Sequence, residues 1–137
     1  MGKLIERLTD ASRSGVYRAS RADEIIDAAR GSKLAVARIT FAGKETLLRD
    51  VAQALHFPKW FGGNWDALQD CLGDLSWSHA RGHVLIVENA MAGEELGIFL
   101  DVLRSSAEYW AVRGRPFFAV FIDPAGSLAL PALYGGK

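Results

Sequence analysis

The most informative stretch of the chain is residues 57–72, which read Phe-Pro-Lys-Trp-Phe-Gly-Gly-Asn-Trp-Asp-Ala-Leu-Gln-Asp-Cys-Leu. An apolar pattern at helical spacing over residues 44–55 stops at Pro58, because a proline does not fit inside a helix. Asn64 is a good N-cap, and we expect it to start a second helix that runs to about Leu75. The segment therefore predicts two helices joined by a turn that carries two aromatic rings and two glycines.

Strand patterns lie on both sides of these helices. Residues 34–41, 83–88 and 117–122 are mostly apolar, and we expect 34–41 to be buried on both faces of a sheet. A long helix is predicted over residues 94–113, with Gly114 at its end. Because each helix returns the chain to the same end, the sequence predicts an α/β fold with a small parallel sheet of three main strands packed with helices.

The chain has 137 residues, half of them apolar, which suits one compact core and excludes two full domains. We assign residues 34–123 to an α/β domain. Residues 1–33 are an N-terminal extension with a short helix, an edge strand that residues 16–17 could form, and a helix capped by Ser20. Residues 124–137, rich in Gly, Pro, Ala and Leu, are expected to be a C-terminal tail in loop conformation.

Acidic and basic residues balance at 16 each, so bulk charge does not favour binding to nucleic acid. The balance hides an asymmetry, since the net charge is −5 over residues 56–112 and positive on either side. A single cysteine, Cys71, excludes an intrachain disulfide and a paired-thiol zinc site. No uncharged apolar stretch approaches the ~20 residues that cross a bilayer, so we expect a cytoplasmic protein without membrane contact.

Three acids follow Asn64 at intervals of four residues: Asp66, Asp70 and Asp74. At that spacing they line one face of a helix, where each like-charged pair costs about 0.2–0.5 kcal/mol. This row of acids is compatible with a helix face that is simply solvated. It is also compatible with a binding surface whose partner supplies positive charge. Trp60 and Phe61 precede the acids, which favours a binding surface with aromatic anchors, although one or both rings could pack into the core.

Residues 57–72 resemble the signature of the barstar family of intracellular ribonuclease inhibitors. That signature has two aromatic residues, Gly, a variable residue, Asn, an apolar residue, Asp-Ala-Leu, a variable residue and Asp-Cys-Leu. The resemblance extends more weakly over residues 34–123 in the order of strands and helices. It implies a barstar-like fold and a non-catalytic, immunity-type inhibitor whose acidic helix and aromatic loop block a basic nuclease active site.

The resemblance also implies roles for individual residues. Asp70 would occupy the phosphate site of an extracellular-type ribonuclease or related nuclease toxin, with Asp66 as its companion. The implied partner-binding residues are Trp60, Phe61, Gly62, Gly63, Asn64, Asp66, Gln69, Asp70 and Asp74. Gln69 stands where the family has an aromatic residue, and Gly63 stands where an acid is frequent. The family's late acidic contact residue has no obvious counterpart near residues 105–108.

Other kinds of site fit the sequence less well. His56, His79 and His83 are scattered, so we expect no metal, and no motif predicts a cofactor. The glycine turn before Asn64 would repel a phosphate because three acids follow it. Cys71 falls on the apolar helix face, which favours a core role over a catalytic thiol. The alternative function is a small enzyme or ligand-binding α/β domain whose acidic helix lines a pocket.

Overall fold

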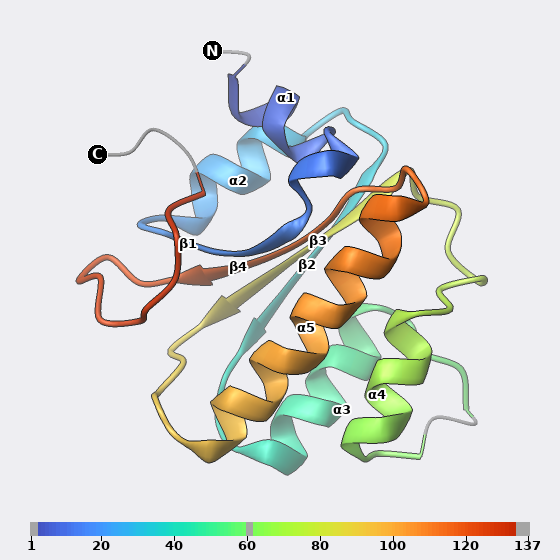
Figure 1. Cartoon of the computed structure of the whole chain (residues 1–137), viewed down its shortest axis with the longest axis vertical. Helices are drawn as coiled ribbons and strands as arrows, with labels where there is room; N and C mark the ends of the chain where they lie inside the picture. Colours follow the sequence, from blue (N-terminus) through green and yellow to red (C-terminus); the bar gives the residue numbers. More distant parts are fainter. Residues whose placement is uncertain (1–2, 60–61, 134–137) are drawn as a thin grey trace.

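The computed structural model describes residues 3–59 and 62–133, and Figure 1 shows its helices and strands arranged around one sheet. In chain order the elements are α1 (Lys3–Leu8), a 3-10 turn η1 (Ala11–Arg13), β1 (Gly15–Ala19), α2 (Ala22–Ala29), β2 (Leu34–Thr40), α3 (Lys44–Ala54), α4 (Trp65–Leu72), β3 (Gly82–Glu88), α5 (Glu94–Val112) and β4 (Phe117–Ile122). The α/β architecture predicted from the sequence is confirmed.

The four strands form one parallel sheet in the order β1-β4-β3-β2. The edge strand anticipated at residues 16–17 is longer, Gly15–Ala19, and it pairs with β4 from Gly15↔Phe118 to Ala19↔Ile122. The sheet therefore includes a strand from the predicted N-terminal extension, residues 1–33, as well as the strands of the predicted domain, residues 34–123.

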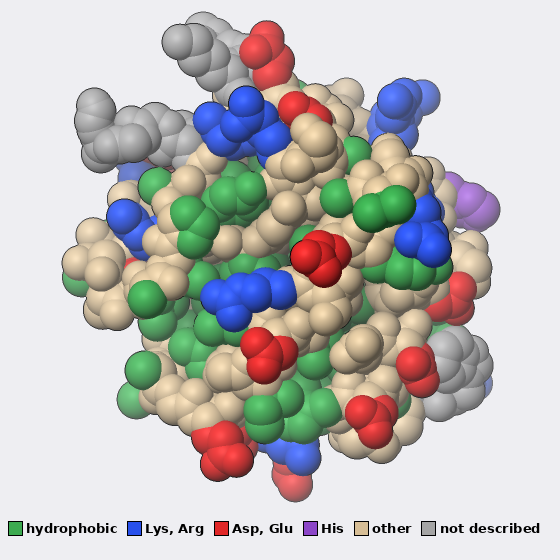
Figure 2. Space-filling view, viewed as in Figure 1, with side chains coloured by type: hydrophobic (Ala, Val, Ile, Leu, Met, Phe, Trp, Pro, Cys, Tyr) green, Lys and Arg blue, Asp and Glu red, His purple; other side chains and the backbone are tan. Residues whose placement is uncertain are grey.

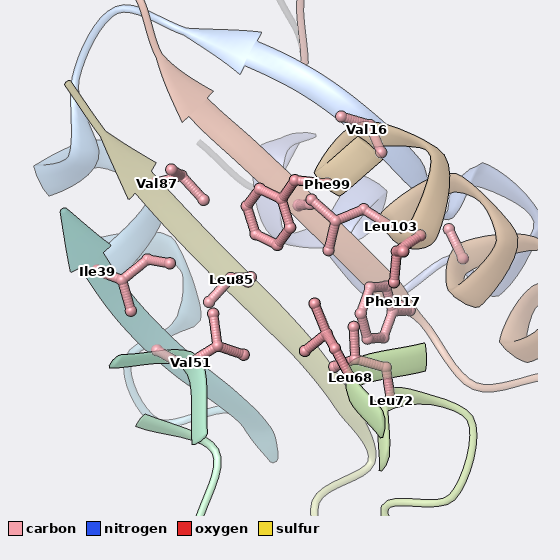
Figure 3. Close-up of a cluster of buried hydrophobic side chains, with 14 of the residues drawn as sticks. Val16, Ile39, Val51, Leu68, Leu72, Leu85, Val87, Phe99, Leu103 and Phe117 are labelled. Carbon is pink, nitrogen blue, oxygen red and sulfur yellow. The ribbon is translucent and has the colours of Figure 1, made fainter. Parts of the chain in front are cut away.

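Helices cover both faces of the sheet (Figure 1). α3, α4 and α5 pack on one face, where Figure 3 shows side chains from helices and strands meeting in one apolar cluster. Its members include Ile39, Val51, Leu68, Leu72, Leu85, Val87, Phe99, Leu103 and Phe117. α1 and α2 cover the other face with a second cluster, which includes Leu4, Leu8, Ile25, Val84, Ile86, Phe118, Val120 and Leu133. The central strands β3 and β4 are thus buried on both faces.

The prediction that residues 34–41 are buried on both faces is wrong. β2 is an edge strand in which Ala37 and Ile39 are buried while Val36, Arg38 and Thr40 are exposed. Among the described residues, β2 contributes only the partly buried Leu34 to the second apolar cluster, so the rest of this strand is uncovered on that face. The start of α2 also differs, because its N-cap is Arg21 rather than Ser20 and no side chain caps it.

The described residues after β4, 123–133, form neither a helix nor a regular strand, yet they pack closely against the sheet. The Asp123 carboxylate accepts hydrogen bonds from the backbone N–H of Leu128 at 2.7 Å and of Ser127 at 3.1 Å, and these bonds lower its pKa. Arg18 and Ala132 form a parallel bridge, and Leu133 is fully buried. The C-terminal segment thus lies along the free side of β1.

In the described part of the chain, no helix is long and apolar enough to span a membrane.

Candidate partner-binding surface

Helix α4 presents the predicted site, and its two ends are fixed by specific contacts. The Asn64 side chain accepts a hydrogen bond from the backbone N–H of Ala67 at 2.7 Å, which confirms the predicted N-cap. At the other end, the Trp110 indole N–H of α5 donates to the carbonyl of Leu72 at 2.7 Å. Leu68 and Leu72 lie on the opposite side of α4 and are fully buried in the core. The packing of these side chains holds the polar side of α4 in a fixed position.

Asp66, Gln69 and Asp70 are exposed on α4 (Asp66 and Asp70 together are the acidic face). The prediction that Asp74 shares the helix is wrong, because α4 ends at Leu72 and Gly73 is its C-cap. The chain leaves the helix so that Leu75, at φ 48°, can bury its side chain in the core. Asp74 is exposed beyond the helix end.

The carboxylates of Asp66 and Asp70 form no ion pair with the described residues. Ion pairs among those residues involve Asp10, Asp23, Asp27, Asp50, Glu88 and Asp101, and none involves the acidic face. Carboxylates spread across the molecular face to which α4 and α5 contribute (Figure 2). The acidic face is thus available to cations from outside the chain.

A hollow of about 290 Å³ lies between α4 and α5, directly beside Asp70. Its lining residues are Gln69, Asp70, Gly73, Ser105, Ser106 and Tyr109, and we call it the α4–α5 hollow. Tyr109 is 39% exposed, and the Arg113 guanidinium lies 3.6 Å from its ring centroid. Sequence reasoning missed Tyr109 and Ser105, because no local signal links residues of α5 to an acid on α4.

The loop before α4 is described only in part. Trp60 and Phe61, the proposed aromatic anchors, lie outside the described residues. Gly62 and Gly63 are exposed, and Gly63 has φ 73°, a conformation that favours glycine. An acidic side chain at position 63 would strain the backbone in this conformation, which gives a physical reason for the glycine.

Cys71 and His83 lie in the interior and do not contribute to the acidic face. Burial raises the pKa of the Cys71 thiol, and Asp74 and Asp70 raise it further, so the sulfur stays protonated. His83 is buried with its Nε2 2.8 Å from the Ser78 hydroxyl, and burial followed by the charge of Arg115 lowers its pKa to about 4. Within residues 3–59 and 62–133, no three His, Cys, Asp or Glu side chains are grouped to hold a metal ion.

Comparisons with known proteins agree with this geometry. The family model described as Barstar (barnase inhibitor) matches residues 33–122, which is more than half of the chain and includes α4, α5 and three of the four strands. Searches of curated proteins and of solved structures gave no match. The continuous match across the sheet, the acidic helix and the helix that supports it means that this chain belongs to the barstar family.

Proposed function

We propose that this chain inhibits a basic ribonuclease by covering its active site with α4 and the loop that precedes it. The observation that carries the proposal is the acidic face, whose two exposed carboxylates have no ion pair within the described residues and stand on a helix anchored in the core. Membership of the barstar family supports an inhibitor of the barnase-inhibitor type over an enzyme.

In the proposed complex, Asp70 takes the place of an RNA phosphate among the cationic side chains of the nuclease. A ribonuclease cleft holds arginine, lysine or histidine to bind a phosphate, so a carboxylate of fixed position meets complementary charge there. Because α4 is already ordered, little conformational entropy is lost on binding. Asp66, one turn earlier, contributes a second charge that speeds the approach of the partner.

Neighbouring residues extend the proposed contact. Tyr109 and Ser105 line the α4–α5 hollow beside Asp70, so a basic side chain of the nuclease that reaches Asp70 would lie next to them. Residues from the loop and from around α4 would surround the acidic face: Trp60, Phe61, Gly62, Gly63, Asn64, Gln69 and Asp74. We further propose that the partner is an extracellular-type ribonuclease or nuclease toxin and that the inhibitor acts in the cytoplasm of the cell it protects.

An inhibition assay tests the proposal with a panel of purified basic ribonucleases that includes barnase. The chain should inhibit at least one member, and Asp70→Asn should weaken that complex by about 2–5 kcal/mol, because the substitution leaves a buried cation of the nuclease unpaired. Glu24→Gln is the matched control, since Glu24 is exposed on α2 across the sheet from α4. It should leave inhibition unchanged.

The salt dependence of association provides a second readout. Association with the inhibited ribonuclease should slow steeply as ionic strength rises, because exposed charges are screened over about 10 Å at 0.1 M salt. Equal losses for Asp70→Asn and Glu24→Gln would contradict the assignment of Asp70. Turnover of a substrate by the chain alone would favour the alternative of a small enzyme with an acidic pocket.

A further inference from the structure

A second charged surface uses no residue of α4, and it is basic. Six arginines form ion pairs with carboxylates: Arg13, Arg21, Arg30, Arg38, Arg49 and Arg104. Lys33, Arg81, Arg113 and Arg115 form no such pair with the described residues. Lys33 immediately precedes β2, Arg81 precedes β3, and the other two precede β4. Because the strands are parallel, these four cations gather at the amino-terminal edge of the sheet.

A hollow of about 340 Å³ lies at this edge, lined by Thr9, Lys33, Leu34, Arg81, Gly114 and Pro116. We call it the basic hollow. Its only charged lining residues among those described are Lys33 and Arg81, and both are exposed. Known ligand pockets span about 300–1,000 Å³, so this volume suits a small ligand or one group of a larger ligand.

Backbone contacts hold the walls of the basic hollow together. The Arg81 N–H donates to the Lys33 carbonyl at 2.8 Å, and the His83 N–H donates to the Pro116 carbonyl at 2.9 Å. Gly82, which lies between Arg81 and His83 in the chain, has no room for a side chain, because a Cβ there would lie 2.8 Å from the Pro116 oxygen. The segments that carry Lys33 and Arg81 are therefore fixed side by side, while the side chains themselves reach into solvent.

The two neighbouring arginines already have partners of their own. Arg115 donates to the Ala80 carbonyl at 2.6 Å and lies 4.9 Å from the Trp110 ring centroid, and Arg113 lies over Tyr109. The Thr9 hydroxyl donates to the Ile5 carbonyl at 2.8 Å. Arg113 and Arg115 are thus held by groups of the chain itself, whereas Lys33 and Arg81 keep their donors for a ligand.

We propose that the basic hollow binds a phosphate group, free or carried on a small molecule such as a nucleoside monophosphate. The Arg81 guanidinium presents a planar fork that matches two phosphate oxygens, and the Lys33 ammonium supplies a second charge. No described acid lines the hollow to repel an anion. This site goes beyond the proposed inhibition and does not depend on it, because it uses no residue of α4.

The test is an NMR titration of the full chain with inorganic phosphate and, separately, with adenosine monophosphate, in a chloride buffer of constant ionic strength. Backbone amides of Lys33, Arg81 and Gly114 should shift saturably. Lys33→Ala and Arg81→Ala should each weaken binding by about tenfold or more, since each removes hydrogen bonds to a charged group. The matched control Arg104→Ala removes an exposed arginine from α5 and should bind phosphate as the unchanged chain does.

The two ligands identify the source of the phosphate. Tighter binding of the nucleotide would assign the site to a nucleotide phosphate, and equal binding would assign it to the free anion. Shifts that do not saturate, or that persist in both Lys33→Ala and Arg81→Ala, would overturn the proposal. Binding of a short RNA with no response to either small anion would also overturn it in favour of a nucleic-acid surface.

Discussion

Asp70 and His83 show how burial divides the roles of titratable residues in this chain. The Asp70 carboxylate faces solvent without an ion pair from the described residues, although the helix that carries it is buried on its other side. His83 lies inside with a hydroxyl partner and a lowered pKa. Asp70 can thus be changed with little effect on the fold, whereas a charge on His83 opposes folding.

His83 makes the stability of the fold depend on pH. Because its pKa is about 4 in the folded chain and about 6.5 when unfolded, the unfolded state binds more protons between these values. Its contribution to stability is fully present above pH 6.5 and is lost as the pH falls towards 4. Between pH 7 and pH 5 we expect a loss of about 2 kcal/mol in the free energy of unfolding.

Urea denaturation at several pH values measures this loss. His83→Gln keeps a polar group next to Ser78 but does not titrate, so its stability should change much less between pH 7 and pH 5. Identical pH profiles for the variant and the unchanged chain would mean that another group causes the dependence.

Helix α4 shows which parts of an element can be predicted from local sequence. Asn64 marks its start correctly, because an N-cap acts within three residues. Its end was predicted too late, since burial of Leu75 and the bond from Trp110 to Leu72 depend on distant parts of the chain. Tyr109 was missed for the same reason. The exposed face of β2 was also missed, because only the strand order identifies β2 as an edge.

The N-cap of α4 supports a prediction about both stability and binding. Asn64→Ala should cost about 1 kcal/mol of unfolding free energy, because the Ala67 N–H loses its acceptor. Asn64→Asp retains a carboxylate cap at the positive end of the helix and should keep the stability within about 0.5 kcal/mol. Thermal and urea denaturation of the two variants provide the comparison. Similar losses in both would show that the cap is not the cause.

At the scale of the whole molecule, the family match and the folded unit differ in extent. The match begins at residue 33, but β1, which is an edge strand of the sheet, and α1 and α2, which cover one face of the sheet, all precede it. The sequence could predict a short strand near residues 16–17. It could not show that Leu8 and Ile25 cover the central strands, since the spacing of so few apolar residues does not identify what they pack against. We propose that residues 3–133 fold as one unit.

Removal of residues 1–32 tests this proposal. The deletion would expose Ile86 and Phe118, which are fully buried on the face that α1 and α2 cover. We expect the shortened chain to lose its cooperative unfolding transition in calorimetry. The point variant Ile25→Ala, which leaves the layer in place, should unfold cooperatively with a loss of about 2–5 kcal/mol. A shortened chain with an unchanged melting temperature would mean that residues 33–122 fold independently.

The two margins of the sheet differ. The C-terminal segment lies against β1 through the Arg18 and Ala132 bridge, whereas β2 has a paired neighbour on one side only. A β-sheet that is open at both margins can recruit copies without limit and grow into a fibre. Here, two copies that joined edge to edge through β2 would use up the open margin of each, so growth by strand addition would stop at a closed pair.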